Sequence, residues 1–229
     1  MPHRLLDLAQ VCAYLRMADG EVRKLVKRDE IPCLLKGERV MFRKRDVDAW
    51  ASQRILSLDP QALGAFRDAA AEEEASIAGL MGRDWIEPGL ASRTKAAVIR
   101  DMVGIADRSG RIYDSADLHD SLREREEIGS TALSGGVALL HPRHHEPYMF
   151  SESIVVLGKC VHPIPFGAPD GGMTDMFFLI CSQYDQLHLR ILSRLCLMMG
   201  KTELLPELRE AEGAQGMYDA ICAAERVVV

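Results

Sequence analysis

Apolar residues recur at helical spacing in two short segments near the N-terminus. In residues 7–15 they line one face, and Asp7 stands where an N-cap is expected. After a turn at residues 16–18, Asp19 is placed to cap a second helix whose apolar positions are Val22, Leu25 and Val26. Two short helices separated by about three residues, the second of them basic, predict a helix-turn-helix.

The next segment has the pattern of a β-hairpin followed by a third helix. Apolar residues 31–35 and 40–42 flank a Lys-Gly-Glu-Arg turn, and a basic run at 43–45 precedes Asp46, the expected cap of a helix through Trp50. This order is similar to the excisionase or MerR-like winged helix-turn-helix family. The resemblance implies that basic side chains face DNA, in the major groove from the second helix and on phosphates from the wing: Arg23, Lys24, Lys27, Arg28, Lys36 and Arg39. A winged module that binds protein instead is the alternative.

The charge is distributed unevenly along the chain. Residues 1–56 carry 12 Lys and Arg against 8 Asp and Glu, a net charge of +4. The total net charge is −6, so the other 173 residues carry a net charge of −10. A small basic module joined to a larger acidic one is typical of a nucleic-acid reader with a regulatory domain, although +4 alone does not decide it.

The rest of the chain predicts a connector followed by an α/β domain. Residues 57–82 are rich in Ala and Glu and predict a helical linker. Beyond it, helices are expected at 95–102, capped by Ser92 or Thr94, and at 115–127. Apolar strands are expected near Val137, Ile154 and Phe177. The alternation of strands and helices indicates an α/β layered fold.

The run from Gly129 to His141 carries the clearest chemistry. It contains a Gly-Ser-Thr start, a Gly-Gly pair and a short apolar strand that ends in the histidine. Glycine-rich turns expose backbone N–H groups that hold phosphate oxygens, and a neutral imidazole is a nucleophile near neutral pH. These residues are therefore compatible with a phosphoryl-accepting histidine; a surface turn that enters a strand ending in a solvated histidine is the alternative for the run alone.

The longer context resembles a known family. Glu124-Arg125-Glu126, the Gly-Ser-Thr turn and the Val-Ala-Leu strand ending at His141 are similar to the phosphorylation-site region of fructose/mannitol-class and nitrogen-regulatory enzyme IIA domains of the phosphotransferase system. Leu140 and Pro142 stand where the family usually has Pro and often has Gly. Downstream, the apolar run 176–181 and a His-Leu-x-x-Leu helix start place His188 as the partner histidine.

That resemblance implies a C-terminal α/β sandwich with a mixed sheet over residues 83–229, after the winged module of residues 1–56. It implies that His141 takes a phosphoryl group from a histidine-containing phosphocarrier protein. Arg125, Ser130 and Thr131 would supply donors to the phosphoryl oxygens, and His188 would steady the transferred group. No cofactor is implied. His144, His145, Cys160 and His162 have irregular spacing for zinc, so no metal site is predicted.

The composition is that of soluble domains with aliphatic cores, with 48% hydrophobic, 27% charged and 6% aromatic residues. No apolar stretch approaches the roughly 18 residues of a membrane span, and no secretory signal is recognised at the N-terminus. The cysteines are scattered without paired spacing, as free thiols in a reducing compartment are. We therefore expect a cytoplasmic protein without membrane insertion.

Three function classes follow from these patterns. In the first, the protein is a regulator in which the phosphorylation state of His141 modulates binding to DNA or a regulatory protein. In the second, the domain relays phosphate to a sugar transporter subunit and the N-terminal module is an interaction platform. The third is a non-phosphorylated scaffold, which Leu140 and Pro142 keep open. A homodimer stays open as well, because one module covers only a half-site.

Overall fold

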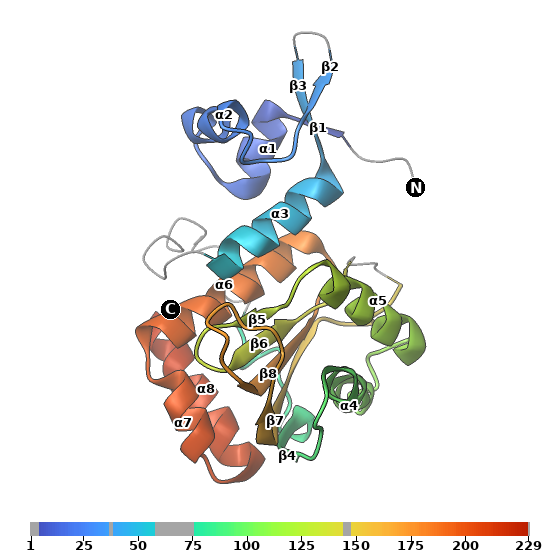
Figure 1. The fold of residues 1–229 in the computed structure, drawn as a ribbon, viewed down its shortest axis with the longest axis vertical. Helices are drawn as coiled ribbons and strands as arrows, with labels where there is room; N and C mark the ends of the chain where they lie inside the picture. The colour runs from blue at the N-terminus through green and yellow to red at the C-terminus, as the bar shows by residue number, and fades with distance from the viewer. Residues whose placement is uncertain (1–4, 37–38, 58–75, 144–147, 229) are drawn as a thin grey trace. The chain divides into compact units, whose positions relative to one another are not determined.

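The computed structural model describes residues 5–36, 39–57, 76–143 and 148–228 (Figure 1). The chain folds as two compact units, Met1–Asp68 and Ala69–Val229. Most of the linker predicted at 57–82, together with His144 and His145, lies outside the described residues, and the same holds for the side chain of Lys36.

The first unit is a helix-turn-helix with a small antiparallel sheet in the order β1-β3-β2. Its buried apolar residues come from every helix and include Val11, Val22, Phe42 and Ile55. The fold class expected for this part is confirmed. The elements are β1 (Leu5–Asp7), α1 (Leu8–Leu15), α2 (Asp19–Lys27), β2 (Leu34–Lys36), β3 (Arg39–Arg43) and α3 (Lys44–Ser57).

Local capping explains where these helices begin. Asp7 accepts from the backbone N–H of Gln10 at 2.8 Å, and the Gln10 side chain accepts from the Asp7 N–H in return, so the expected N-cap is confirmed as a capping box. α2 departs from expectation because its N-cap is Ala18; Asp19 pairs instead with Arg23 one turn later. α3 begins at Lys44, two residues before the expected cap. The short β1 was not predicted.

The second unit is a mixed α/β layer structure. Within its described part the sheet has five strands in the order β4-β7-β8-β6-β5, with β4 parallel to β7, β6 parallel to β8 and the other pairs antiparallel. The elements are η3 (Arg83–Trp85), β4 (Ile86–Leu90), α4 (Lys95–Asp107), α5 (Ser115–Ile128), β5 (Ala132–Leu133), β6 (Val137–Leu140), β7 (Ile154–Ile164), β8 (Thr174–Cys181), α6 (Asp185–Lys201), α7 (Leu204–Glu210) and α8 (Gly213–Val228).

Helices cover both faces of this sheet, with α4 and α5 on one side and α6, α7 and α8 on the other (Figure 1). Residues of β6 and β8 alternate between the faces: Ala138 and Phe177 join the core under α4 and α5, while Leu139 and Phe178 are buried on the opposite side. Burial on both faces explains why these strands read as continuous apolar runs. Thr94 is confirmed as the cap of α4, since its hydroxyl accepts from the Ala97 N–H.

Residues 76–82 form a turn, not the helical connector expected there. Glu225 of α8, which is 6% exposed, accepts from the backbone N–H groups of Ile77 and Ala78 at 2.6 and 3.0 Å and from the Ser76 hydroxyl at 3.1 Å. The side chain of Arg194 donates to the same carboxylate at 3.1 Å. A buried carboxylate therefore fixes residues 76–78, and no local sequence pattern predicts this contact.

The longest helix of the described residues is α6, with 17 residues and ten of them buried. Across the described ranges, every helix falls short of the combined length and apolarity that crossing a membrane requires.

Candidate functional site

Sheet topology brings the two expected histidines together. His141 directly follows β6, and His188 lies in the first turn of α6, the helix that follows β8. Because β6 and β8 are adjacent and parallel, their carboxyl ends lie at the same edge of the sheet. The imidazole rings meet there with centroids 4.6 Å apart and an angle of 45° between their planes.

The hydrogen bonds of His141 define its protonation. Its Nδ1 lies 2.9 Å from the carbonyl oxygen of Leu139, and a carbonyl only accepts, so Nδ1 carries the proton. Its Nε2 accepts from Nε of Arg125 at 3.0 Å. His141 is thus a neutral imidazole whose Nε2 lone pair faces a guanidinium. The side chain is buried, with 3% exposed.

Arg125 lies in the last turn of α5 and is held at two points. Besides the bond to His141, its Nη1 donates to the carbonyl of Gly129 at 3.0 Å. Burial lowers the pKa of Arg125 and the neighbouring Glu126 carboxylate opposes that shift, yet a guanidinium keeps its charge in proteins. The residue therefore places a fixed cation and a planar set of donors beside Nε2 of His141.

The Gly-rich run from Gly129 to His141 places residues at both ends of β6. Gly135 and Gly136 form the β5-β6 hairpin at the far end of the strand from His141, with φ of 89° and 86°. A Cβ on Gly136 would lie 2.7 Å from the Arg209 guanidinium and 3.2 Å from a backbone oxygen, so this tight turn requires glycine. Because β5 is antiparallel to β6, residues 129–131, which precede β5, lie at the His141 end of β6. Only this part of the run lies beside the histidine.

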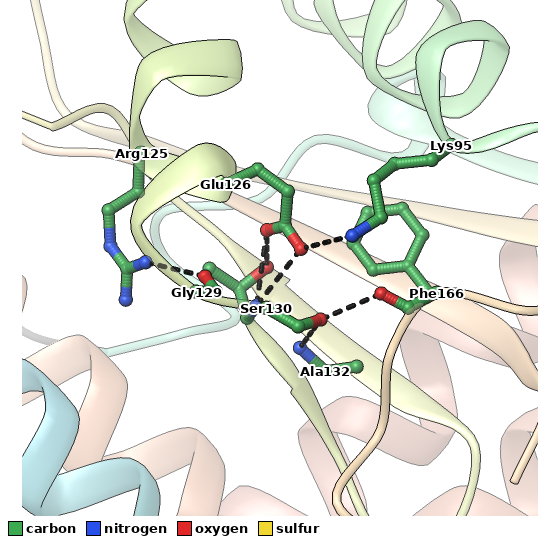
Figure 2. A network of polar contacts seen from close by, with 8 residues as sticks. Lys95, Arg125, Glu126, Gly129, Ser130, Ala132 and Phe166 are labelled. Carbon is green, nitrogen blue, oxygen red and sulfur yellow. Dashed lines mark hydrogen bonds and ion pairs between the residues drawn. The ribbon is translucent and has the colours of Figure 1, made fainter. Parts of the chain in front are cut away.

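The expected donors Ser130 and Thr131 hydrogen-bond elsewhere in this structure. The Ser130 hydroxyl donates to the carbonyl of Phe166 at 2.8 Å (Figure 2). The Thr131 hydroxyl donates to Glu126 at 2.7 Å. Both fix the turn between α5 and β5 and are not directed at His141.

Glu126 and Lys95 are site residues that the sequence reasoning did not single out. Glu126 is 8% exposed; it also accepts from the Thr131 N–H at 3.1 Å and pairs with Nζ of Lys95 at 2.9 Å (Figure 2). The Glu-Arg-Glu triplet was the available signal for Glu126. No pattern links Lys95, 31 residues earlier, to it.

Metal ligands do not gather in the part of the chain that the structure describes: no three His, Cys, Asp or Glu side chains come together there as a site. His162 is exposed on β7, and Cys160 is buried on the same strand.

The basic side chains of α2 lie on its exposed side. Val22 and Leu25 are buried, whereas the four basic residues proposed for the major groove are exposed: Arg23, Lys24, Lys27 and Arg28. Arg39, at the start of β3, is exposed as well. Two of these side chains have acidic neighbours within the unit, since Arg23 contacts Asp19 and Arg28 lies 3.9 Å from Glu30.

Two family models match the chain. Residues 80–223 match the phosphoenolpyruvate-dependent sugar phosphotransferase system, EIIA 2, and residues 5–55 match a helix-turn-helix domain.

The individual relatives agree with the first model. A fructose-specific EIIABC component of the phosphotransferase system from Bacillus subtilis is 25% identical over 147 residues, which are 63% of this chain and 23% of that protein. Among solved structures, nitrogen regulatory protein IIA-Ntr from Neisseria meningitidis superposes with a TM-score of 0.57 at 22% identity, over 63% of this chain and 98% of that one. The mannitol enzyme IIA from Escherichia coli, solved in complex with phosphorylated enzyme IIB, gives 0.56 at 15% identity, over 62% and 97%.

Proposed function

Because this chain belongs to the phosphoenolpyruvate-dependent sugar phosphotransferase system EIIA 2 family and carries a helix-turn-helix domain, we propose that it is a phosphorylation-dependent regulator. His141 accepts a phosphoryl group from a histidine-containing phosphocarrier protein. Its phosphorylation state then modulates binding of the helix-turn-helix unit to DNA, or of the protein to a regulatory partner.

The observation that carries this proposal is the arrangement at Nε2 of His141. The Leu139 carbonyl holds the proton on Nδ1, the Nε2 lone pair faces the Arg125 guanidinium, and the His188 ring lies alongside. Any buried imidazole needs a donor for its second nitrogen, and here the donor is also a cation. A cation suits a nucleophile that must receive an anion, because it is already placed where the charge arrives.

The chemistry requires no separate proton transfer. Nε2 attacks the phosphorus of the carrier's phosphohistidine, whose other ring nitrogen carries a proton. An N–P bond forms on His141, and the N–P bond on the carrier breaks with its electron pair returning to the carrier's imidazole, which leaves as the neutral ring. The His141 ring gains positive charge, and the Nδ1–H bond to Leu139 stabilises that charge. His188 packs beside the ring and limits its rotation.

Arg125 changes partner during the transfer. Its Nε donates to Nε2 of His141 in the resting structure, and that lone pair becomes the N–P bond. We assign the freed N–H to a phosphoryl oxygen, while the bond from Nη1 to Gly129 keeps the guanidinium in place. Phosphoryl transfer depends mainly on such positioning and charge stabilisation. In this assignment Ser130 and Thr131 shape the turn and leave the oxygens to Arg125 and to backbone N–H groups.

The test is phosphorylation by phosphoenolpyruvate through purified general phosphotransferase proteins, read by intact mass. We expect an acid-labile adduct of about 80 Da, one phosphoryl group, on the natural protein and none on His141→Ala. His162→Ala is the matched control, because His162 is an exposed histidine of the same domain. An unmodified natural protein, or an adduct that persists in His141→Ala, would refute His141 as the acceptor and favour the scaffold reading.

The regulatory half is tested by the effect of phosphate on DNA binding. A phosphoryl group adds close to two negative charges, enough to change docking of a neighbouring surface. We expect the full chain to select DNA fragments from a genomic library and its affinity for them to change at least several-fold on phosphorylation. Equal affinity of the two forms would remove the regulatory link.

A second candidate is the relay of phosphate to a sugar transporter subunit, favoured by two comparisons. One relative is a fructose-specific EIIABC component, and one matching fold was solved with its phosphorylated enzyme IIB. The discriminating observation is transfer of phosphate from His141 to a purified enzyme IIB, with no retention of DNA by the chain.

A further inference from the structure

We infer that Glu126 and Lys95 form a positioning pair for the phosphoacceptor: the pair holds the turn that fixes the tautomer of His141 and leaves Arg125 free for the phosphoryl group. The inference rests on the proposed function of His141. Neither residue touches the reacting nitrogen, so both act through others.

Glu126 organises the backbone at the His141 end of the β5-β6 pair. Both its oxygens accept from the Thr131 N–H, at 3.1 and 3.3 Å, and one also accepts the Thr131 hydroxyl at 2.7 Å. A carboxylate that receives both donors of one residue fixes that residue's position and orientation. Thr131 is 1% exposed, so water does not replace these bonds.

From Thr131 the constraint reaches His141 through two further hydrogen bonds. The Thr131 carbonyl accepts from the Leu139 N–H at 3.1 Å, and the Leu139 carbonyl accepts from Nδ1 of His141 at 2.9 Å. The second of these bonds keeps the proton on Nδ1 and the lone pair on Nε2. A shift of Thr131 therefore moves the group that selects the reactive tautomer.

Lys95 balances the charge of Glu126. Its Nζ lies 2.9 Å from Oε1 of Glu126 and 4.5 Å from the centroid of the Phe166 ring. The backbone carbonyl of Phe166 accepts from the Ser130 hydroxyl. The Glu126 side chain is 4% exposed, and a buried carboxylate requires a partner cation. Figure 2 shows the Glu126 carboxylate turned toward Lys95 and the Arg125 guanidinium turned toward Gly129.

This division of partners has a consequence for Arg125. Arg125 and Glu126 are neighbours in sequence with opposite charges, and consecutive side chains of a helix point in different directions. With Glu126 occupied by Lys95 and Thr131, the guanidinium is directed at His141 and Gly129. Without Lys95, the charge of Glu126 is uncompensated and acts on the Arg125 guanidinium and on the incoming phosphoryl group.

The test compares Lys95→Met, Lys95→Arg and Glu126→Gln in phosphoryl transfer from the carrier. We expect Lys95→Met and Glu126→Gln to lower kcat roughly 10- to 100-fold with KM for the carrier within about two-fold, because docking is unaffected and alignment is lost. Lys95→Arg should restore most of kcat. Arg100→Met is the matched control, since Arg100 is an exposed cation of the same helix.

A second readout does not depend on phosphorylation. In the ¹⁵N-histidine spectrum of the natural protein, we expect His141 to carry its proton on Nδ1; in Glu126→Gln and Lys95→Met we expect a mixture of tautomers. Variants with natural kcat and a natural tautomer would overturn the inference. So would a loss of rate that follows a raised KM or a lowered Tm and is not rescued by Lys95→Arg. If the natural protein takes no phosphate, the proposed function fails, and the tautomer measurement still decides the pair.

Discussion

Replacing Arg125 with methionine removes two hydrogen bonds and one buried cation while keeping a side chain of similar length. The guanidinium donates to Nε2 of His141 and to the Gly129 carbonyl, each at 3.0 Å, from a residue that is 7% exposed. Methionine donates to neither. Arg125→Lys keeps the charge but presents a compact ammonium in place of the planar fork, so it cannot reproduce both bonds in the same geometry.

The magnitude follows from what each bond does. Nε of Arg125 is released from Nε2 of His141 when the N–P bond forms, and this is the donor assigned to a phosphoryl oxygen. Removing one positioned donor to developing negative charge typically costs about 10²- to 10³-fold in rate. The Gly129 bond orients the guanidinium and is retained through the step. We therefore expect Arg125→Met to slow phosphorylation about 10²- to 10³-fold. Arg125→Lys should slow it roughly ten-fold, because charge survives while alignment does not.

The assay is rapid-quench phosphorylation by the phosphorylated carrier protein under single-turnover conditions, with far-UV circular dichroism to show that each variant is folded. Arg123→Met, on the same helix and largely exposed, is the control and should react at the natural rate. A natural rate in folded Arg125→Met would refute the assignment of Arg125 to the phosphoryl group. Equal losses in Arg125→Met and Arg125→Lys would show that geometry, and not charge, carries the whole effect.

Three further predictions concern the rest of the molecule. Glu225→Ala should lower the free energy of unfolding by about 3 kcal/mol in urea titration, because one buried and one part-buried backbone N–H group lose their acceptor. Glu225→Gln should cost about 1 kcal/mol, and equal losses in the two variants would contradict this account. Burial raises the pKa of Cys160 to about 11 and that of Cys196 to about 12, so neither thiol should be alkylated by iodoacetamide at pH 8 until the protein unfolds. For the same reason the free energy of unfolding should fall as the pH rises above 9, because the thiols of the unfolded chain ionise first. Peptide mapping that finds either thiol labelled in the native protein would contradict that burial. If the helix-turn-helix unit binds DNA phosphates through α2, Lys24→Ala should weaken binding to all sequences alike and reduce the slope of log K against log salt by about one; an unchanged slope would remove Lys24 from the interface.

The sequence by itself predicted several helices and the apolar strands, and it named the candidate site residues. Apolar residues at helical spacing located α1, α2 and α6. Continuous apolar runs located β6 and β8, because the residues of these strands are buried on both faces of one sheet. The short strands β1 and β5, with three and two residues, carried no pattern of their own. His141 and Arg125 were proposed from the run 124–141 and His188 from a second motif downstream, both through the resemblance to enzyme IIA domains.

Only the tertiary structure decided which of those residues meet and what each one contacts. The parallel pairing of β6 with β8 brings His188 to His141 across 47 residues of chain, and the antiparallel return of β5 brings Thr131, and not the Gly-Gly pair, to the histidine. Lys95 reaches Glu126 because α4 packs beside α5. Hydrogen-bond partners and ion pairs depend on distances of about 3 Å, which separation along the chain does not fix, so the tautomer of His141 and the roles of Glu126 and Lys95 belong to the fold.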